Sequence, residues 1–170
     1  MPETVQVEQY RFADDGTIPN NPDLPLLVYR GALPAASDRA ASFEDLFRRN
    51  DWSGGWRDGI FAYHHYHSTA HEVLGIAAGR ARVRFGGEQG RSVEVSAGDV
   101  VVIPAGVGHR CEEKSGDLLV VGAYPGGNGP DLCTGRTGER EKALANIGRV
   151  GRPSADPILG RDGPLLRAWR

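Results

Sequence analysis

Short apolar segments separated by glycine-containing turns fill the middle of the sequence, from Gly59 to Tyr124. Segments of this length and composition are typical of antiparallel β-strands. Their even spacing favours a closed barrel or jelly roll, because wrapping a sheet round removes its exposed edges. The expected strands span residues 61–67, 72–77, 81–85, 92–95, 100–103, 109–113 and 118–124. We therefore predict an all-β fold for this part of the chain.

The remaining residues add elements on both sides of the barrel. A length of 170 residues allows one domain with a core of its own. We expect residues 1–58 to supply N-terminal strands and one short helix, residues 59–124 the barrel core, and residues 125–170 a loop-rich C-terminal extension. Within the first section, residues 5–12 and 26–29 have the composition of strands.

The short helix of the N-terminal section is expected to run from about residue 37 to residue 50. Phe43 and Phe47 are four residues apart, so they would share one face of the helix and bury it. Ser42 followed by Asp45 resembles a capping box with the shorter acid. The section therefore carries one amphipathic helix.

Two features of the C-terminal extension predict further structure. Residues 139–146 have the pattern of a short helix. The chain ends in an apolar segment at residues 165–169, which we expect to pack on the barrel or on a neighbouring subunit.

Charge and composition limit the class of partner. The sequence has 20 basic and 22 acidic residues, a net charge of −2, and no long run of like charge. This balance argues against nucleic acid and membrane surfaces, so we expect a small-molecule partner. No apolar segment approaches membrane-spanning length, and residues 1–12 lack the pattern of a signal peptide. Because Cys111 and Cys133 are too few for a secreted disulfide scaffold, we predict a cytoplasmic protein.

Four residues of the expected barrel have the chemistry of metal ligands. His65 and His67 alternate along one strand, so both can point inward while His64 and Tyr66 point away. Glu72 opens the next strand, whose antiparallel return would bring its carboxylate beside the two imidazoles. His109 begins a later strand just after a tight turn, and it could reach the same point from across the barrel.

Three imidazoles and one carboxylate suit a single divalent transition-metal ion, which could be iron, manganese, nickel, cobalt or zinc. Such a ligand set leaves coordination positions open for water or substrate. The alternative is a solvated histidine cluster, or a barrel that has lost its ion.

Other polar residues near these four have two interpretations each. His64 and His71 would be surface residues, or would orient a ligand or take part in catalysis. Tyr66 would pack in the core or at an interface, or would lie beside the metal ligands or the cavity. Cys111 would line the cavity if its strand stays regular, or would serve as a small buried apolar residue. Arg82 and Arg84 alternate with apolar residues, which favours a solvent-facing position over a carboxylate-binding clamp.

The spacing of these residues resembles two motifs of the cupin superfamily. The first reads Gly59, five residues, His65-Tyr66-His67, four residues, Glu72, six residues, Gly79. The second reads Gly98, five residues, Pro104-Ala105-Gly106, two residues, His109, with Glu113 where that motif usually ends in Asn. The resemblance implies a double-stranded β-helix barrel, metal ligands at His65, His67, Glu72 and His109, and frequent homodimers. Glu113 is expected to lie too far along its strand to be a ligand, and to form a salt bridge at the rim.

Four further segments are similar to the YjlB-like branch of single-domain bacterial cupins. They are residues 20–25, 67–75, 85–90 and 122–125. This resemblance extends the expected fold over most of the chain. It implies no reaction, because none is assigned to that branch.

These observations predict a metal-binding cupin, and foremost a metal-dependent enzyme that acts on a small polar metabolite. Iron would favour dioxygenase chemistry, whereas manganese, nickel or zinc would favour isomerase, decarboxylase or hydrolase chemistry. The alternative is a non-catalytic cupin that binds or senses a small ligand or a metal. No helix-turn-helix pattern is present, so transcription control by this chain alone is not expected.

Overall fold

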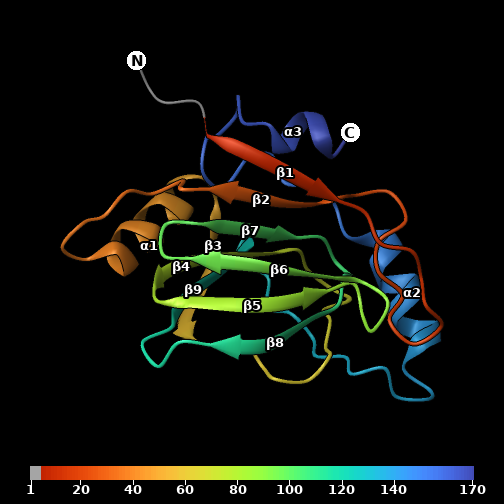
Figure 1. The fold of residues 1–170 in the computed structure, drawn as a ribbon. Helices are drawn as coiled ribbons and strands as arrows, with labels where there is room; N and C mark the ends of the chain where they lie inside the picture. Colours follow the sequence, from red (N-terminus) through yellow and green to blue (C-terminus); the bar gives the residue numbers. More distant parts are fainter. Residues whose placement is uncertain (1–4) are drawn as a thin grey trace.

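The computed structural model describes residues 5–170, and residues 1–4 of the expected N-terminal section lie outside it. The described chain forms two antiparallel sheets that face each other, with helices at the outside (Figure 1). One sheet has the strand order β1-β2-β7-β4-β9-β3 and the other has the order β6-β5-β8. The strands are β1 Gln6–Tyr10, β2 Leu26–Arg30, β3 Trp52–Asp58, β4 Glu72–Ala78, β5 Arg80–Phe85, β6 Arg91–Ser96, β7 Val100–Ile103, β8 His109–Lys114 and β9 Leu119–Pro125. This is the predicted double-stranded β-helix, a jelly-roll barrel.

Apolar side chains from both sheets fill the space between them. In β5 the buried residues alternate with Arg82 and Arg84, which face outward. This half-buried pattern is what a strand with one solvated face requires. The core between the sheets includes Leu74, Val101 and Ile103 from the larger sheet and Val83, Phe85 and Val95 from the smaller.

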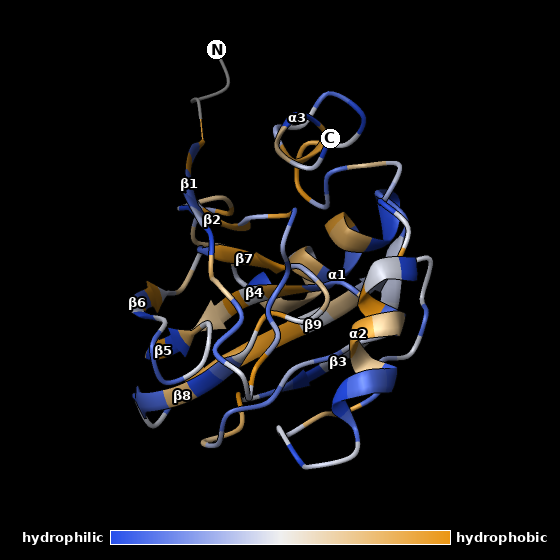
Figure 2. Cartoon of the chain, turned by 90° about the vertical axis from the view of Figure 1, so that its right-hand side faces the viewer, coloured by the Kyte–Doolittle hydropathy of each residue, from blue (hydrophilic) through white to orange (hydrophobic). Residues whose placement is uncertain are grey.

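Strand β7 is buried on both faces, and its sequence is accordingly apolar throughout (Figure 2). Val101 and Ile103 point between the sheets, whereas Val100 and Val102 belong to a second core on the outer face of the larger sheet. Helix α1 and the C-terminal segment cover that outer face. A strand covered on both sides needs a continuous apolar run rather than alternation.

Helix α1 spans Arg39–Arg49 and lies against β4. The predicted capping box at Ser42 and Asp45 is wrong, because Asp38 caps the helix by accepting a hydrogen bond from the backbone N–H of Ala41 at 3.0 Å. Asp38 is better placed because it directly precedes the first helical turn. As predicted, Phe43 is fully buried on the inner face of the helix, with Phe47 beside it.

The C-terminal extension forms helices α2 Arg140–Arg149 and α3 Leu165–Ala168. The apolar tail packs on the barrel of its own chain, the first of the two expected positions. Trp169 is 2% exposed and donates a hydrogen bond from its indole to the backbone oxygen of Pro25 at 2.8 Å. Asp156 accepts hydrogen bonds from the hydroxyl of Tyr29 and the backbone of Leu165, which ties the tail to β2.

The strand expected at residues 61–67 is wrong. Strand β3 lies earlier, at Trp52–Asp58, and pairs with β9 through an irregular register between Ser53 and Trp56. The intervening Gly54 has a φ of +68°, a left-handed conformation that glycine adopts without strain. The other expected strands are confirmed to within two residues at each end. Residues 59–71 instead form an irregular segment held by isolated bridges.

The helices of residues 5–170 are all too short or too polar to cross a membrane.

Candidate metal centre

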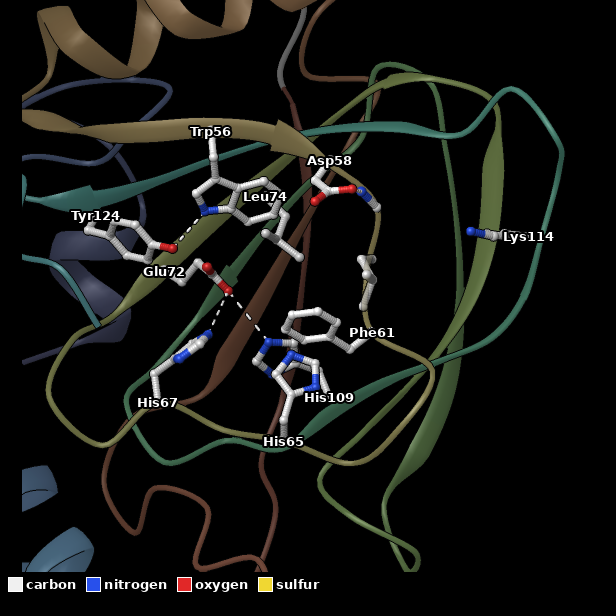
Figure 3. A pocket seen from close by; sticks show the side chains of 12 residues that line it. Trp56, Asp58, Phe61, His65, His67, Glu72, Leu74, His109, Lys114 and Tyr124 are labelled. Atoms are coloured by element: carbon white, nitrogen blue, oxygen red, sulfur yellow. Dashed lines mark hydrogen bonds and ion pairs between the residues drawn. The ribbon is translucent and has the colours of Figure 1, made fainter. Parts of the chain in front are cut away.

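Three histidines meet inside the barrel near one end (Figure 3). His65, His67 and His109 each offer a ring nitrogen, and these three atoms all lie within 4.8 Å of one another. His65 reaches this point through an isolated bridge, in which its backbone exchanges hydrogen bonds of 3.2 and 2.9 Å with His109 at the start of β8. The three histidines could therefore hold one metal ion.

Main-chain carbonyl groups fix the orientation of all three rings. The Nδ1 atoms of His65, His67 and His109 lie 2.9, 2.5 and 3.2 Å from the backbone oxygens of Tyr63, Asp131 and Val107, respectively. Because a carbonyl oxygen only accepts hydrogen bonds, each Nδ1 must carry a proton. A neutral ring then has its lone pair on Nε2. This is the tautomer that metal-ligating histidines adopt when a carbonyl orients them.

Glu72 adds a carboxylate to the same cluster. It opens β4, is 3% exposed, and lies with its Oε1 atom 3.5 Å from the Nε2 atoms of both His67 and His109. The four residues predicted as ligands thus come together around one point (Figure 3). An isolated buried carboxylate is costly, so this arrangement calls for a cation beside it.

The pKa values of the cluster reflect the opposing effects of burial and of hydrogen bonds and charges within the cluster. Although burial raises the pKa of Glu72, hydrogen bonds with His109 and His67 lower it well below its ordinary value, so the carboxylate stays ionised. Burial, followed by the nearby His109, lowers the pKa of His65 to about 3. Burial also lowers the pKa of His67, but hydrogen bonding to Glu72 and the charge of Glu72 raise it above the ordinary value overall. An ionised carboxylate beside imidazole nitrogens fits a divalent first-row metal ion, which would displace any proton held between Glu72 and His67.

A cavity of about 400 Å³ opens above the cluster. Its floor is formed by the three histidines and Glu72 (Figure 3). The other lining residues are Trp56, Asp58, Gly59, Ile60, Phe61, Leu74, Lys114 and Tyr124. The centre is therefore reachable by a small molecule, and the walls beside it are largely apolar.

Asp131, in the C-terminal extension, holds the segment that carries His67. Its carboxylate accepts a hydrogen bond from the hydroxyl of Ser68 and others from the backbone N–H groups of Ser68, at 2.7 Å, and Thr69, at 3.3 Å. In addition, Tyr66 and Cys133 exchange two backbone hydrogen bonds of 2.9 Å. The sequence gives no signal for Asp131, because it lies 64 residues from His67 in a stretch without regular structure.

The other candidate residues lie outside the cavity lining. His64 lies at the rim with its Nε2 atom 2.6 Å from Glu88. Tyr66 is fully buried in a small cluster with Ile18 and Cys133. Cys111 is buried in the core between the sheets, where burial raises the pKa of its thiol.

His71 lies in a different part of the molecule, against the C-terminal tail. Its Nδ1 accepts a hydrogen bond from the backbone N–H of Ala105 at 2.9 Å, and its Nε2 donates to the backbone oxygen of Gly151 at 3.1 Å. Its ring contacts Trp169. Burial lowers the pKa of His71 to about 4, so it serves as a neutral link between the barrel and the tail.

The arginines of β5 pair with acidic residues of β8 rather than forming a clamp in the cavity. Arg82 lies 2.9 Å from Glu113, the salt bridge expected at the rim, and Arg84 lies 3.4 Å from Glu112.

Comparison with known proteins gives one family and one closely similar chain. Residues 57–121 match the model of the cupin domain family. The chain is 46% identical over 164 residues to the "Uncharacterized protein YjlB" of Bacillus subtilis (strain 168), covering 96% of this chain and 97% of the relative.

Solved structures are more distantly similar. An oxalate decarboxylase of Bacillus subtilis with Mn(II) centres is 16% identical at a TM-score of 0.36, and the match covers 79% of this chain but only 29% of the decarboxylase. An uncharacterised protein with a double-stranded β-helix domain from Klebsiella pneumoniae is 11% identical at a TM-score of 0.38, covering 79% of this chain and 81% of the other. Similarity at this level has no bearing on the reaction.

Proposed function

Since the chain belongs to the cupin family, we propose that it is a metal-dependent enzyme that acts on a small polar metabolite inside the barrel. His65, His67, Glu72 and His109 would hold one divalent ion of iron, manganese, nickel, cobalt or zinc. The observation that carries the proposal is the common orientation of the three rings. Each Nδ1 is hydrogen-bonded to a backbone carbonyl, which leaves each Nε2 free, and those of His67 and His109 lie 3.5 Å from the buried Glu72.

The chain's own groups each have a defined part in this proposal. The three carbonyl groups keep the imidazoles in one tautomer and one rotation, so that no reorientation is needed on binding. Glu72 supplies the negative charge that offsets a cation in a buried place. The apolar walls of the cavity exclude water around the bound metabolite. A bound ion would supply Lewis-acid or redox chemistry, consistent with a dioxygenase, isomerase or decarboxylase type of reaction.

Metal analysis of protein purified without chelators tests the binding step. We expect about one equivalent of a transition metal per chain, and a loss of most of it in His65→Ala and His109→Ala. His64→Ala is the matched control, because its ring lies beside Glu88 at the rim. Less than about 0.2 equivalents in the unaltered protein, not restored by reloading, would contradict the proposal.

A turnover assay tests the catalytic step separately. The metal-loaded protein would be incubated with a panel of small polar metabolites, with and without oxygen. We expect one of them to be depleted at a rate that falls in His109→Ala. Tight binding without conversion would favour a non-catalytic binding or sensing cupin.

Further properties belong to the same proposal. We propose one domain over residues 1–170, a homodimer, a cytoplasmic location, and partners that include neither nucleic acid nor membrane. The net charge of −2 supports the last of these. Light scattering of the purified protein would distinguish a dimer of about twice 18.3 kDa from a monomer.

A further inference from the structure

The two oxygens of the Glu72 carboxylate face different surroundings. Its Oε1 atom lies 3.5 Å from the Nε2 atoms of both His67 and His109, on the side where an ion would be held. Its other oxygen lies on the side of Tyr124 (Figure 3). Glu72 is 3% exposed, so bulk water does little to solvate this second oxygen. An ionised carboxylate oxygen in such a place is costly without a hydrogen-bond donor.

The hydroxyl of Tyr124 is the donor that faces Glu72. Tyr124 lies near the end of β9, which pairs with β4, and it is 6% exposed. Burial and the charge of Glu72 raise the pKa of Tyr124, the hydrogen bond from Trp56 lowers it, and a hydrogen bond to Glu72 raises it further. The hydroxyl therefore keeps its proton at neutral pH. Because an ionised carboxylate can only accept, Tyr124 donates this proton to Glu72 in a hydrogen bond.

Trp56 determines the direction in which this hydroxyl donates. The indole Nε1 of Trp56 lies 2.6 Å from the hydroxyl oxygen of Tyr124. An indole N–H can only donate, so the hydroxyl oxygen accepts this hydrogen bond, and its own proton is left for Glu72. The three side chains thus form a series in which each donates to the next, from indole to hydroxyl to carboxylate.

A glycine in β9 allows the indole to take up this position. Gly122 is the partner of Trp56 in the pairing of β3 with β9, and the register is regular from this pair to Asp58. A Cβ atom at Gly122 would overlap three atoms of the indole ring, Nε1 among them. The indole therefore lies directly over the backbone of β9, on a paired strand rather than on a loop. Its N–H is fixed where it meets the Tyr124 hydroxyl.

From these contacts, and resting on the proposed function, we propose that Tyr124 and Trp56 are positioning residues for the metal ligand Glu72. The hydroxyl of Tyr124 occupies one carboxylate oxygen, which leaves Oε1 as the single oxygen directed at the ion. Without this hydrogen bond the carboxylate is free to rotate, and its two oxygens compete for the same place. Groups that orient a metal ligand in this way contribute about tenfold to a hundredfold to affinity.

Zinc affinity, measured by competition with a chromogenic chelator, tests the proposal without any assay of turnover. Tyr124→Phe removes the hydroxyl and keeps the ring, and we expect it to weaken zinc binding about tenfold or more. Trp56→Phe keeps the donor but removes the group that directs it, so a smaller loss is expected. Tyr10→Phe is the matched control and should bind zinc as the unaltered protein does. Its hydroxyl also donates to a carboxylate, that of Glu8 at 2.6 Å, but on β1, at the other edge of the larger sheet from β3.

A double-mutant cycle separates positioning of Glu72 from a general structural role. In Glu72→Ala the three histidines remain as ligands, but the carboxylate on which Tyr124 acts is gone. Adding Tyr124→Phe to Glu72→Ala should therefore change zinc affinity by less than about twofold. The visible spectrum of bound cobalt(II) gives a second readout, because it depends on how the ligands are arranged. It should differ between the unaltered protein and Tyr124→Phe, but not between Glu72→Ala and the double variant.

Several outcomes would overturn the proposal. Unchanged zinc affinity and an unchanged cobalt spectrum in a folded Tyr124→Phe would show that Glu72 is oriented without the hydroxyl. An equal loss of affinity with and without Glu72 would show that Tyr124 supports the barrel rather than the ligand. An unchanged affinity in Trp56→Phe would remove Trp56 from the series. Failure of the unaltered protein to bind zinc or cobalt would instead refute the proposed function, and this proposal with it.

Discussion

The Nδ1 atom of His67 lies 2.5 Å from the backbone oxygen of Asp131, 64 residues further along the chain. The same residue's carboxylate accepts hydrogen bonds from Ser68 and Thr69, so Asp131 holds both the ring and the backbone that carries it. This places part of the candidate centre in the C-terminal extension rather than in the barrel. Residues outside the barrel core therefore decide how well one ligand is oriented.

Replacing Asp131 tests this dependence. In Asp131→Asn the amide cannot accept as strongly from Ser68 and Thr69, so the segment that carries His67 should lose its fixed orientation. We expect affinity for zinc to fall about tenfold or more, as is usual when groups that orient metal ligands are removed. Competition with a chromogenic chelator would measure it.

The control is Asp162→Asn, an exposed aspartate of the same extension. Its zinc affinity should equal that of the unaltered protein. Equal affinity in Asp131→Asn as well would show that His67 is oriented without help from the extension.

His71 should make the protein sensitive to acid. Burial lowers its pKa from 6.5 to about 4 in the folded state, so the unfolded chain binds a proton between these values and the folded chain does not. Folding stability is thus fully present above pH 6.5 and falls as the pH drops toward 4, by about 3 kcal/mol over the whole interval. Urea unfolding at several pH values measures it.

The variant His71→Asn removes the titrating group at this position. The difference between its pH profile and that of the unaltered protein isolates the contribution of His71, since other acid-sensitive groups are common to both. Parallel profiles between pH 4 and 6.5 would show that His71 is protonated in the folded protein.

Gly75 allows helix α1 to approach β4. A Cβ atom at this position would lie 2.8 to 2.9 Å from ring atoms of Phe43, closer than packed side chains approach. We expect Gly75→Ala to lower the free energy of unfolding by about 1–3 kcal/mol, the usual cost of overpacking a core. Thermal and urea denaturation would measure this.

Two further variants test whether contact with Phe43 causes the loss of stability in Gly75→Ala. Gly116→Ala, where a Cβ atom meets nothing within 4 Å, should change stability by much less. Adding Phe43→Leu to Gly75→Ala should cost less than the sum of the two single changes, because the smaller side chain relieves the clash. Strict additivity would contradict this explanation.

Glu72 should control the protonation of His67 in the metal-free protein. Its charge and hydrogen bond raise the pKa of His67 against the effect of burial. In Glu72→Gln burial is opposed only by the hydrogen bond and charge of Asp131, so the pKa of His67 should fall, as followed by NMR titration of the ring. Glu88→Gln, beside His64 at the rim, should leave His67 unchanged. A pKa of His67 that stays raised in Glu72→Gln would assign the shift to another group.

Much of the barrel could be predicted from the sequence because each strand carries its own local pattern. The alternation in β5 and the continuous apolar run of β7 follow directly from which faces are covered. The four clustered residues could be predicted from the spacing of their motifs, although His65 and His67 lie in an irregular segment rather than on the expected strand. Helix α1 was also predicted, although its cap at Asp38 was not.

The remaining features depend on contacts that a local pattern does not encode. Strand β3 contains Gly54 and Gly55, which indicate a turn by composition but form an irregularity in the strand. Gly55 is needed there because a Cβ atom would lie 2.8 Å from the backbone oxygen of Gly122 in β9. Asp131 gains its role only from the folded position of distant segments. Such long-range pairings have no signature in a single sequence.

Anomalous diffraction from a crystal of protein loaded with one equivalent of zinc or cobalt would show whether these four residues bind one ion. We expect a single strong peak inside the barrel, about 2.0–2.2 Å from the Nε2 atoms of His65, His67 and His109 and from a carboxylate oxygen of Glu72. A peak bound elsewhere, or rings turned so that an Nδ1 atom faces the ion, would contradict it.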